Sequence, residues 1–296
     1  MNLKFTGTGV ALVTPFKKFA VDFDGLAAVI NHVIDGGVDY VVSLGTTGEP
    51  VTMTPAEQLA VLEFTIKQVA GRCRIVAGFG GNNTAKLQEE IGAFHFEGVD
   101  AILSASPAYN KPTQEGIYAH YMALAETAPR PIILYNVPGR TASNMAADTT
   151  LRLAAQGIAH FAGMKEASGN LAQVMAISKY KPADFALISG DDNLTLPMMS
   201  VGAEGLISVT ANAFPHQVSK MVAFATAGDF AAARQFHFSL QDMTDLFFID
   251  GNPAGVKGAL EQLGICSNEV RLPLLPLTEK TAAAIASELL SVCGKS

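Results

Sequence analysis

The chain has no tryptophan and little charge: of its 296 residues, 16% are charged and 49% are hydrophobic. Typical domains carry roughly 25% charged residues, so few charges are left to coat the surface of a lone monomer. We therefore expect a homo-oligomer. The 27 acidic residues outnumber the 20 basic ones and no basic cluster stands out, which argues against nucleic acid as a partner.

Cysteine is scarce, and long apolar runs are missing. Cys73, Cys266 and Cys293 form no CxxC pair and leave one thiol over in any disulfide scheme, which is typical of a reducing compartment. We expect all three to be inert apolar fillers. No stretch of about 18 apolar residues occurs, and the first sixteen residues show no leader cleavage site. These absences favour a cytoplasmic protein that does not enter a membrane.

Several catalytic motifs are also missing. The histidines form no HxxxH or HxH pair, which disfavours a metal-dependent aldolase; they are His32, His95, His120, His160, His216 and His237. The segment 78–83 lacks the third glycine of GxGxxG, and neither a GxxxxGK[ST] nor a GxSxG element appears. Nucleotide binding and serine hydrolysis are therefore unsupported.

What recurs instead is a short apolar run followed by a helical pattern. Eight such runs are expected to be strands: Gly9–Val13, Tyr40–Leu44, Ile75–Phe79, Ala101–Ser104, Ile132–Tyr135, Phe161–Met164, Phe185–Ile188 and Gly205–Val209. Continuous apolar runs indicate parallel strands covered on both faces. Eight alternating strand and helix units predict an α/β fold, a (β/α)8 TIM barrel.

After the eighth run the strand signals stop. Helices are expected over Pro215–Ala227, Asp229–Phe248, Pro253–Leu263 and Glu279–Val292. We predict a barrel over residues 1–228 and a helical extension of the same domain over 229–296. Within the barrel, Thr54, Pro55 and Glu57 have the pattern of a capping box at a helix start.

The ends of the predicted strands carry the candidate site residues, because active sites of such barrels lie at the carboxyl ends of the strands. Lys165 follows an apolar run where poor solvation disfavours its ammonium form and favours a nucleophilic amine. Tyr135 suits proton transfer, and Arg140 can hold a carboxylate. Taken singly, these could equally be a rim lysine, a half-buried aromatic and a solvated loop charge.

Glycine-containing turns follow two more strands. Gly45–Glu49 could grip a carboxylate through backbone N–H groups and hydroxyls, although glycine and threonine are ordinary in a plain βα turn. Gly190 could admit a substrate closely. Asp192 or Asn193 could cap the next helix, and we favour the capping role for the two aspartates, Asp191 and Asp192.

Six segments together carry a resemblance to a known family over essentially the whole chain. They are GTTGE at 45–49, YNKP at 109–112, YNVPGRTA at 135–142, GMKEASGN at 163–170, SGDD at 189–192 and ISVTAN at 207–212. The chain resembles the 4-hydroxy-tetrahydrodipicolinate synthase family. The parent superfamily includes N-acetylneuraminate lyase and 2-keto-3-deoxygluconate aldolase, but the segments at 135–141, 189–192 and 207–212 look like the dipicolinate branch.

The resemblance implies a lyase of lysine and diaminopimelate biosynthesis that condenses pyruvate with L-aspartate 4-semialdehyde. Lys165 would form the pyruvate imine, which needs no metal and no organic cofactor. Thr46 and Thr47 would hold the pyruvate carboxylate, and Gly190 and the backbone carbonyl of Ile207 would line the pyruvate pocket.

The same resemblance assigns the remaining roles. Tyr135, Thr47 and Tyr109 would form a proton relay, and Arg140 would bind the carboxylate of the semialdehyde. Because Tyr109 would reach into the site of a neighbouring subunit, the active unit should be at least a dimer, commonly within a dimer of dimers.

The chain departs from the family at a regulatory site. In many bacterial members, free lysine inhibits by binding at the dimer interface. The positions that would bind it here hold Pro50, Val51, Pro55, Gln58, Lys86 and Ala108. A cationic ligand would meet Lys86 in place of a carboxylate, so we predict weak or absent inhibition by lysine.

Two rival functions stay open on the sequence. Another pyruvate-dependent aldolase or dehydratase, acting on a sugar acid or a hydroxyproline derivative, would share Lys165 but would need neutral groups where Arg140 stands. A catalytically silent barrel that senses a keto acid would be expected to have lost Lys165 or Tyr135, and both are present.

Overall fold

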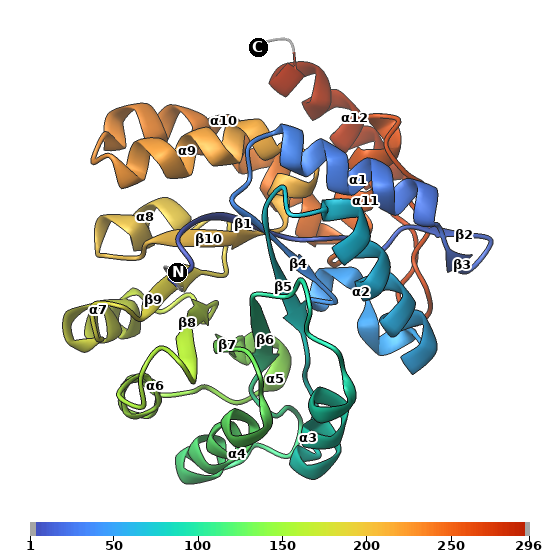
Figure 1. The fold of residues 1–296 in the computed structure, drawn as a ribbon. Coiled ribbons are helices and arrows are strands. Elements are labelled where there is room, and N and C mark those ends of the chain that lie inside the picture. Colours follow the sequence, from blue (N-terminus) through green and yellow to red (C-terminus); the bar gives the residue numbers. More distant parts are fainter. Residues whose placement is uncertain (1–3, 294–296) are drawn as a thin grey trace.

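The computed structural model describes residues 4–293, and its centre is a closed barrel of eight parallel strands (Figure 1). The barrel strands are β1 (Gly7–Ala11), β4 (Tyr40–Ser43), β5 (Arg74–Gly78), β6 (Ala101–Ala105), β7 (Ile132–Asn136), β8 (Phe161–Glu166), β9 (Ala186–Ser189) and β10 (Gly205–Ser208). Each pairs with its neighbour in chain order, and β1 closes the barrel against β10 and β4. The predicted TIM barrel is confirmed, with strand boundaries shifted by one or two residues.

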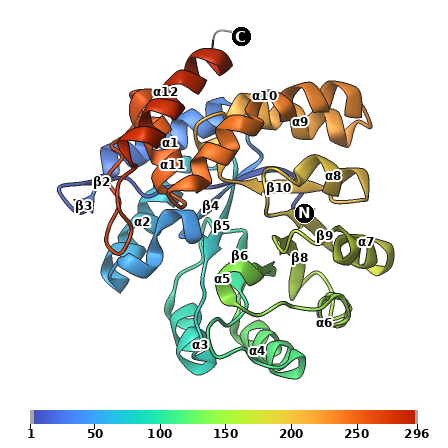
Figure 2. The same ribbon diagram turned by 180° about the vertical axis from the view of Figure 1, so that it is seen from behind.

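Helices surround the barrel (Figures 1 and 2). Those of the barrel units are α1 (Phe23–Asp35), α2 (Pro55–Val69), α3 (Thr84–Ala93), α4 (Gln114–Thr127), α5 (Pro138–Thr141), α6 (Ala147–Ala154), α7 (Leu171–Tyr180), α8 (Thr195–Ser200) and α9 (Pro215–Thr226). The predicted capping box is present, because the hydroxyl of Thr54 accepts from the backbone N–H of Glu57, whose carboxylate accepts from the N–H of Thr54.

Three further helices form the C-terminal extension: α10 (Phe230–Ile249), α11 (Ala254–Gln262) and α12 (Glu279–Cys293). They gather on one side of the barrel together with α9 and α1 (Figure 1). The four helices expected after residue 214 are therefore confirmed. Between residues 4 and 293, no helix is both long and apolar enough to cross a membrane.

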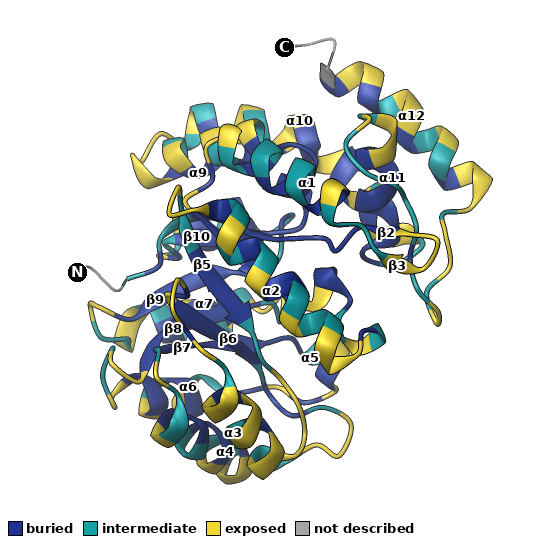
Figure 3. Cartoon of the chain, turned by 45° about the vertical axis from the view of Figure 1, so that its right-hand side comes forward, coloured by how far each residue is buried: buried dark blue, intermediate teal, exposed yellow. Residues whose placement is uncertain are grey.

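Two sets of buried side chains hold these layers together. Successive strand residues point to opposite faces, so Val41 packs with the outer helices while Tyr40 and Val42 belong to a separate inner cluster. The inner cluster consists almost entirely of strand residues and fills the barrel, as is usual for this fold. The barrel strands are accordingly buried over most of their length, and exposed positions lie on the outer faces of the helices and in loops (Figure 3).

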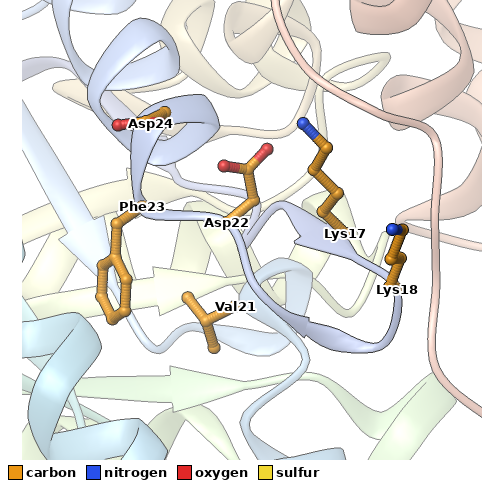
Figure 4. A pocket seen from close by; sticks show the side chains of 6 residues that line it. All are labelled: Lys17, Lys18, Val21, Asp22, Phe23 and Asp24. Carbon is orange, nitrogen blue, oxygen red and sulfur yellow. The ribbon is translucent and has the colours of Figure 1, made fainter.

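A small antiparallel hairpin was not predicted from the sequence. It pairs β2 (Phe16–Lys17) with β3 (Ala20–Val21), two residues each, which is too short for a periodic pattern to reveal. An open hollow beside it is lined by Lys17, Lys18, Val21, Asp22, Phe23 and Asp24 (Figure 4). None of these is a candidate site residue.

Candidate active site

A β-bulge in β8 aims Lys165 into the barrel. Ile132 pairs with Phe161, but the next residue, Ile133, pairs with Gly163, so β8 contains one extra residue. Beyond the bulge Lys165 lies opposite Tyr135. If the register of Ile132 and Phe161 continued without the bulge, Met164 would lie opposite Tyr135 and face inward, and Lys165 would face the helices, because side chains alternate between faces. The bulge left no signal in the sequence pattern.

Lys165 is buried against Tyr135 at the carboxyl ends of β8 and β7. Its side chain is 5% exposed, and its Nζ lies 4.4 Å from the centroid of the Tyr135 ring. Gly190, just after β9, adjoins the same side chain: a Cβ built on Gly190 would lie 3.0 Å from both Cγ and Cε of Lys165. Three of the predicted site residues are therefore brought together, and the glycine is there because a larger side chain would press on the lysine.

A polar network behind these residues was missed by the sequence analysis. The buried carboxylate of Glu166, next to Lys165, accepts hydrogen bonds from the side chain of Asn136 and the backbone N–H of Ser168, at 2.6 Å in the second case. Gln173 donates to the same carboxylate at 2.9 Å. Asn136 follows Tyr135 directly, so this network fixes the ends of the two strands that carry the lysine and the tyrosine.

The interpretation of the two aspartates as helix caps is wrong for Asp192. The N-cap residue of helix α8 is Leu194, which makes no side-chain cap, and the carboxylate of Asp191 accepts from the N–H of Leu194 at 3.1 Å. Asp192 is buried and accepts from the Ser208 hydroxyl and, at 2.9 Å, from the N–H of Val209. Burial raises the pKa of Asp192, while these hydrogen bonds and the charge of Lys165 oppose that rise. Asp192 thus ties the end of β10 to the loop after β9.

The loop after β4 is held by the C-terminal extension. Thr46 is exposed, whereas Thr47 is buried and its Oγ1 accepts a hydrogen bond from the side-chain amide of Asn252 at 3.0 Å. Two residues on, Glu49 forms a buried ion pair with Lys257 at 2.5 Å. Burial lowers the pKa of Lys257, and the Glu49 carboxylate opposes that shift. None of these links to the extension was expected from the sequence.

Tyr109 and Arg140 lie on two loops that are joined to each other. The N–H of Tyr109 donates to the carbonyl of Thr141 at 3.1 Å, and Asn82 bonds both the N–H and the carbonyl of Ala108. This bracing presents the Tyr109 side chain outward, 90% exposed. Arg140 is exposed too, and within residues 4–293 its guanidinium makes no ion pair.

The chain by itself does not assemble the predicted proton relay. Over the described residues, no hydrogen bond joins the hydroxyls of Tyr135, Thr47 and Tyr109, so the relay stays a prediction. Ile207 lies in β10 with its side chain in the inner cluster.

The cysteines are the other potential nucleophiles that the sequence analysis considered. Cys73 and Cys266 are free and half-buried, and burial raises their pKa values to about 11 and about 12, so both thiols are protonated, as expected of inert fillers. The side chain of Cys293 lies outside the described residues. Among the residues that the structure does describe, no group of three or more histidine, cysteine or acidic side chains could hold a metal ion.

A barrel of eight parallel strands with a buried lysine beside a tyrosine at the strand ends has the architecture of a class I aldolase, which uses lysine as a covalent nucleophile. A model of the dihydrodipicolinate synthetase family matches residues 4–291. The chain therefore belongs to this family.

Individual relatives agree with this assignment. A 4-hydroxy-tetrahydrodipicolinate synthase of Parabacteroides distasonis is 50% identical over 277 residues, which cover 93% of this chain and 92% of the relative. A dihydrodipicolinate synthase structure from Aquifex aeolicus has a TM-score of 0.92 at 40% identity and covers 96% of this chain and 97% of its own. A structure of the Acinetobacter baumannii enzyme complexed with pyruvate has a TM-score of 0.93 at 38% identity, covering 97% and 99%.

Proposed function

We propose that this protein condenses pyruvate with L-aspartate 4-semialdehyde to give 4-hydroxy-tetrahydrodipicolinate, in lysine and diaminopimelate biosynthesis. The observation that carries the proposal is the placement of Lys165, buried against the Tyr135 ring and pressed close by Gly190. The names of the relatives support the reaction, and the pyruvate complex of the Acinetobacter baumannii enzyme supports the first substrate. They favour it over the rival sugar-acid or hydroxyproline chemistry.

The reaction follows from the nucleophilicity of a buried amine. The neutral Nζ of Lys165 adds to the keto carbon of pyruvate, and loss of water gives an iminium ion. The iminium accepts electron density when a proton leaves the methyl carbon, so the resulting enamine is neutral and no free carbanion forms. The enamine carbon then attacks the aldehyde carbon of the semialdehyde. Attack of the semialdehyde's amine on the imine carbon closes the ring and releases Lys165.

The remaining site residues receive roles in this scheme. Thr46 and Thr47 hold the pyruvate carboxylate, while Gly190 and the carbonyl of Ile207 line the pyruvate pocket. Arg140 binds the carboxylate of the semialdehyde, which suits a guanidinium that is exposed and makes no ion pair over the described part of the chain.

Proton movement completes the scheme. Tyr135, Thr47 and Tyr109 relay protons. Because the Tyr109 side chain is 90% exposed in the single chain, we assign it to the site of a second copy. The protein is then a homo-oligomer, a dimer of dimers, and we place it in the cytoplasm.

The test combines covalent trapping with turnover. Borohydride reduction in the presence of pyruvate should leave a lactyl-sized adduct on Lys165, located by peptide mapping, and the protein should consume aspartate semialdehyde. The Lys165→Ala variant serves as the control that loses both. An adduct without consumption of the semialdehyde would refute the second substrate and favour the sugar-acid or hydroxyproline alternative, and no adduct at all would refute the Schiff-base mechanism.

A further inference from the structure

Asn252 belongs to the loop between α10 and α11, in the C-terminal extension, yet its side chain reaches the candidate active site. The side chain is buried, with 8% of the residue exposed, and its Nδ2 donates to Oγ1 of Thr47 at 3.0 Å. That is the only hydrogen bond made by this side chain among the described residues, and its Oδ1 is buried with no hydrogen-bond partner there. Among the described residues, this amide therefore bonds the threonine and no group of its own loop.

A donor at this position restricts the direction of the threonine proton. A hydroxyl has one hydrogen to donate and two lone pairs to accept with. When the Asn252 amide occupies one lone pair of Thr47, the hydroxyl hydrogen must point to a different partner. A hydrogen oriented before the ligand arrives costs less to use than one that rotates freely.

The loop does not depend on this one bond for its shape. Glu49, two residues after Thr47, is anchored by Lys257 at 2.5 Å and by the N–H of Arg271 at 3.1 Å. The amide of Asn252 therefore adds orientation to a segment that is already held in place.

We propose that Asn252 is a positioning residue for the reaction: its amide N–H group orients the Thr47 hydroxyl so that the hydroxyl donates its hydrogen to the carboxylate of pyruvate. The inference rests on the proposed function, in which Thr47 holds that carboxylate. Its measurable consequence lies in the KM for pyruvate, with a smaller change in kcat and none in the KM for the aldehyde.

The sharpest variant is Asn252→Asp, which keeps the shape of the side chain and reverses its polarity. The new carboxylate would accept the Thr47 hydrogen and turn it away from pyruvate. We expect the KM for pyruvate to rise by about tenfold or more, because one oriented hydrogen bond to a charged group is lost. At low pH the new carboxyl becomes protonated and can donate again, so kcat/KM for pyruvate should recover toward acid pH relative to the parent protein.

Two further variants separate orientation from folding. Asn252→Ala removes the donor without adding an acceptor and should raise the KM for pyruvate less than Asn252→Asp does. Asn268→Asp, in the same extension, should leave KM and the pH profile unchanged, because over residues 4–293 the side chain of Asn268 bonds only the carboxylate of Glu261. A purely structural role of Asn252 would lower kcat and the melting temperature without an acid-side recovery, and that result would overturn the proposal.

A double-mutant cycle covers the case in which Asn252→Asp does not fold. In a Thr47→Val background, Asn252→Ala should cause no further rise in the KM for pyruvate, because there is no hydroxyl left to orient. An undiminished effect in that background would contradict the proposal. If the parent protein traps pyruvate but rejects aspartate semialdehyde, only the proposed second substrate is refuted. The pyruvate concentration for half-maximal borohydride trapping then replaces the KM in each comparison, and the same changes are expected.

Discussion

At the scale of single residues, the space around Lys165 is set by Gly190. A Cβ at this position would lie 3.0 Å from Cγ and Cε of Lys165 and 2.8 Å from the Cβ of Ala167. These contacts are too short, and Gly190 has no left-handed backbone that would add strain of its own. Lys165 can therefore occupy this position only because residue 190 has no side chain.

We predict that Gly190→Ala slows imine formation with little loss of stability. Displacement of Lys165 from its attack geometry should lower the rate of pyruvate-dependent borohydride trapping by about tenfold or more. The melting temperature should fall by only a few degrees. Gly81→Ala is the matched control, because a Cβ at Gly81 meets nothing within 4 Å. Equal trapping rates for both variants would contradict the prediction.

A second residue-scale property is the buried imidazole of His120. Its Nδ1 lies 2.8 Å from the Thr84 hydroxyl, its Nε2 has no partner among the described residues, and burial lowers its pKa to about 4. The unfolded chain takes up this proton near pH 6.5. The contribution of His120 to the free energy of unfolding is therefore fully present above pH 6.5 and is lost as the pH falls toward 4.

We predict that His120→Gln flattens the pH dependence of stability in this window. The parent protein should lose on the order of 3 kcal/mol of unfolding free energy between pH 6.5 and 4 through this group. Urea unfolding at pH 7, 5.5 and 4 measures the slope. His95→Gln, at an exposed position, should keep the parent slope, and identical slopes for the two variants would show that His120 is not the group responsible.

At the scale of elements, Arg271 joins three parts of the fold. Its guanidinium donates to the carbonyl of Phe19 in the hairpin, to the carbonyl of Thr52, and to both carboxylate oxygens of Glu57 at the start of α2. It also lies 4.3 Å from the centroid of the Phe16 ring. A single side chain thus attaches the extension to the hairpin and to the loop that precedes α2.

We predict that Arg271→Lys destabilises the protein although the charge is kept. An ammonium cannot reproduce the planar, bidentate contact with Glu57 together with the carbonyl bonds, so we expect a loss of about 1–3 kcal/mol of unfolding free energy. Thermal unfolding checks this. Arg234→Lys, at an exposed site on α10, is the control and should be neutral; an equally neutral Arg271→Lys would show that the network contributes no net stability.

The elements also show what could be read from the sequence and what could not. All eight barrel strands were predictable, because each is buried on both faces and reads as a continuous apolar run. The hairpin at Phe16–Val21 was not, since two-residue strands have no period. The bulge in β8 was equally hidden, because register depends on the pairing with β7 and not on β8 alone.

The same distinction applies to the candidate site. Lys165, Tyr135 and Gly190 stand at strand ends, so their meeting follows from the barrel. Asn252 and Lys257 are separated from the loop they hold by about 205 residues of chain, and only the fold brings them there. Asp192 looked like a helix cap because it precedes a helix, but its hydrogen bonds run to β10 instead.

At the scale of the whole molecule, the exposed position of Tyr109 predicts a site shared between two copies. Lys165→Ala and Tyr109→Phe should each be nearly inactive alone. After subunit exchange in an equal mixture, about a quarter of the parent activity should return, because half of the random dimers pair one defective site with one intact site. Turnover after mixing measures the regain of activity, and sedimentation checks that the mixture keeps the oligomeric state of the parent protein. No regain, with exchange demonstrated, would place Tyr109 in the site of its own chain.

The other whole-molecule property is regulation, which the surface near Tyr109 addresses. Val51 is 94% exposed, in the short 3-10 helix Pro50–Thr52. The Nζ of Lys86 lies 3.4 Å from Glu90 on an exposed face of α3, and Ala108 offers no phenol. A free lysine brought to this surface meets an ammonium group and finds no unpaired carboxylate at the Lys86 position.

We therefore predict that free lysine inhibits weakly or not at all. The half-maximal concentration should exceed about 10 mM, which corresponds to a binding free energy weaker than about 3 kcal/mol. Initial rates at saturating substrates, with lysine varied at constant ionic strength, measure it. Lys86→Glu replaces the repelling charge with a carboxylate and should lower that concentration. Half-maximal inhibition of the parent protein at submillimolar lysine would refute the prediction.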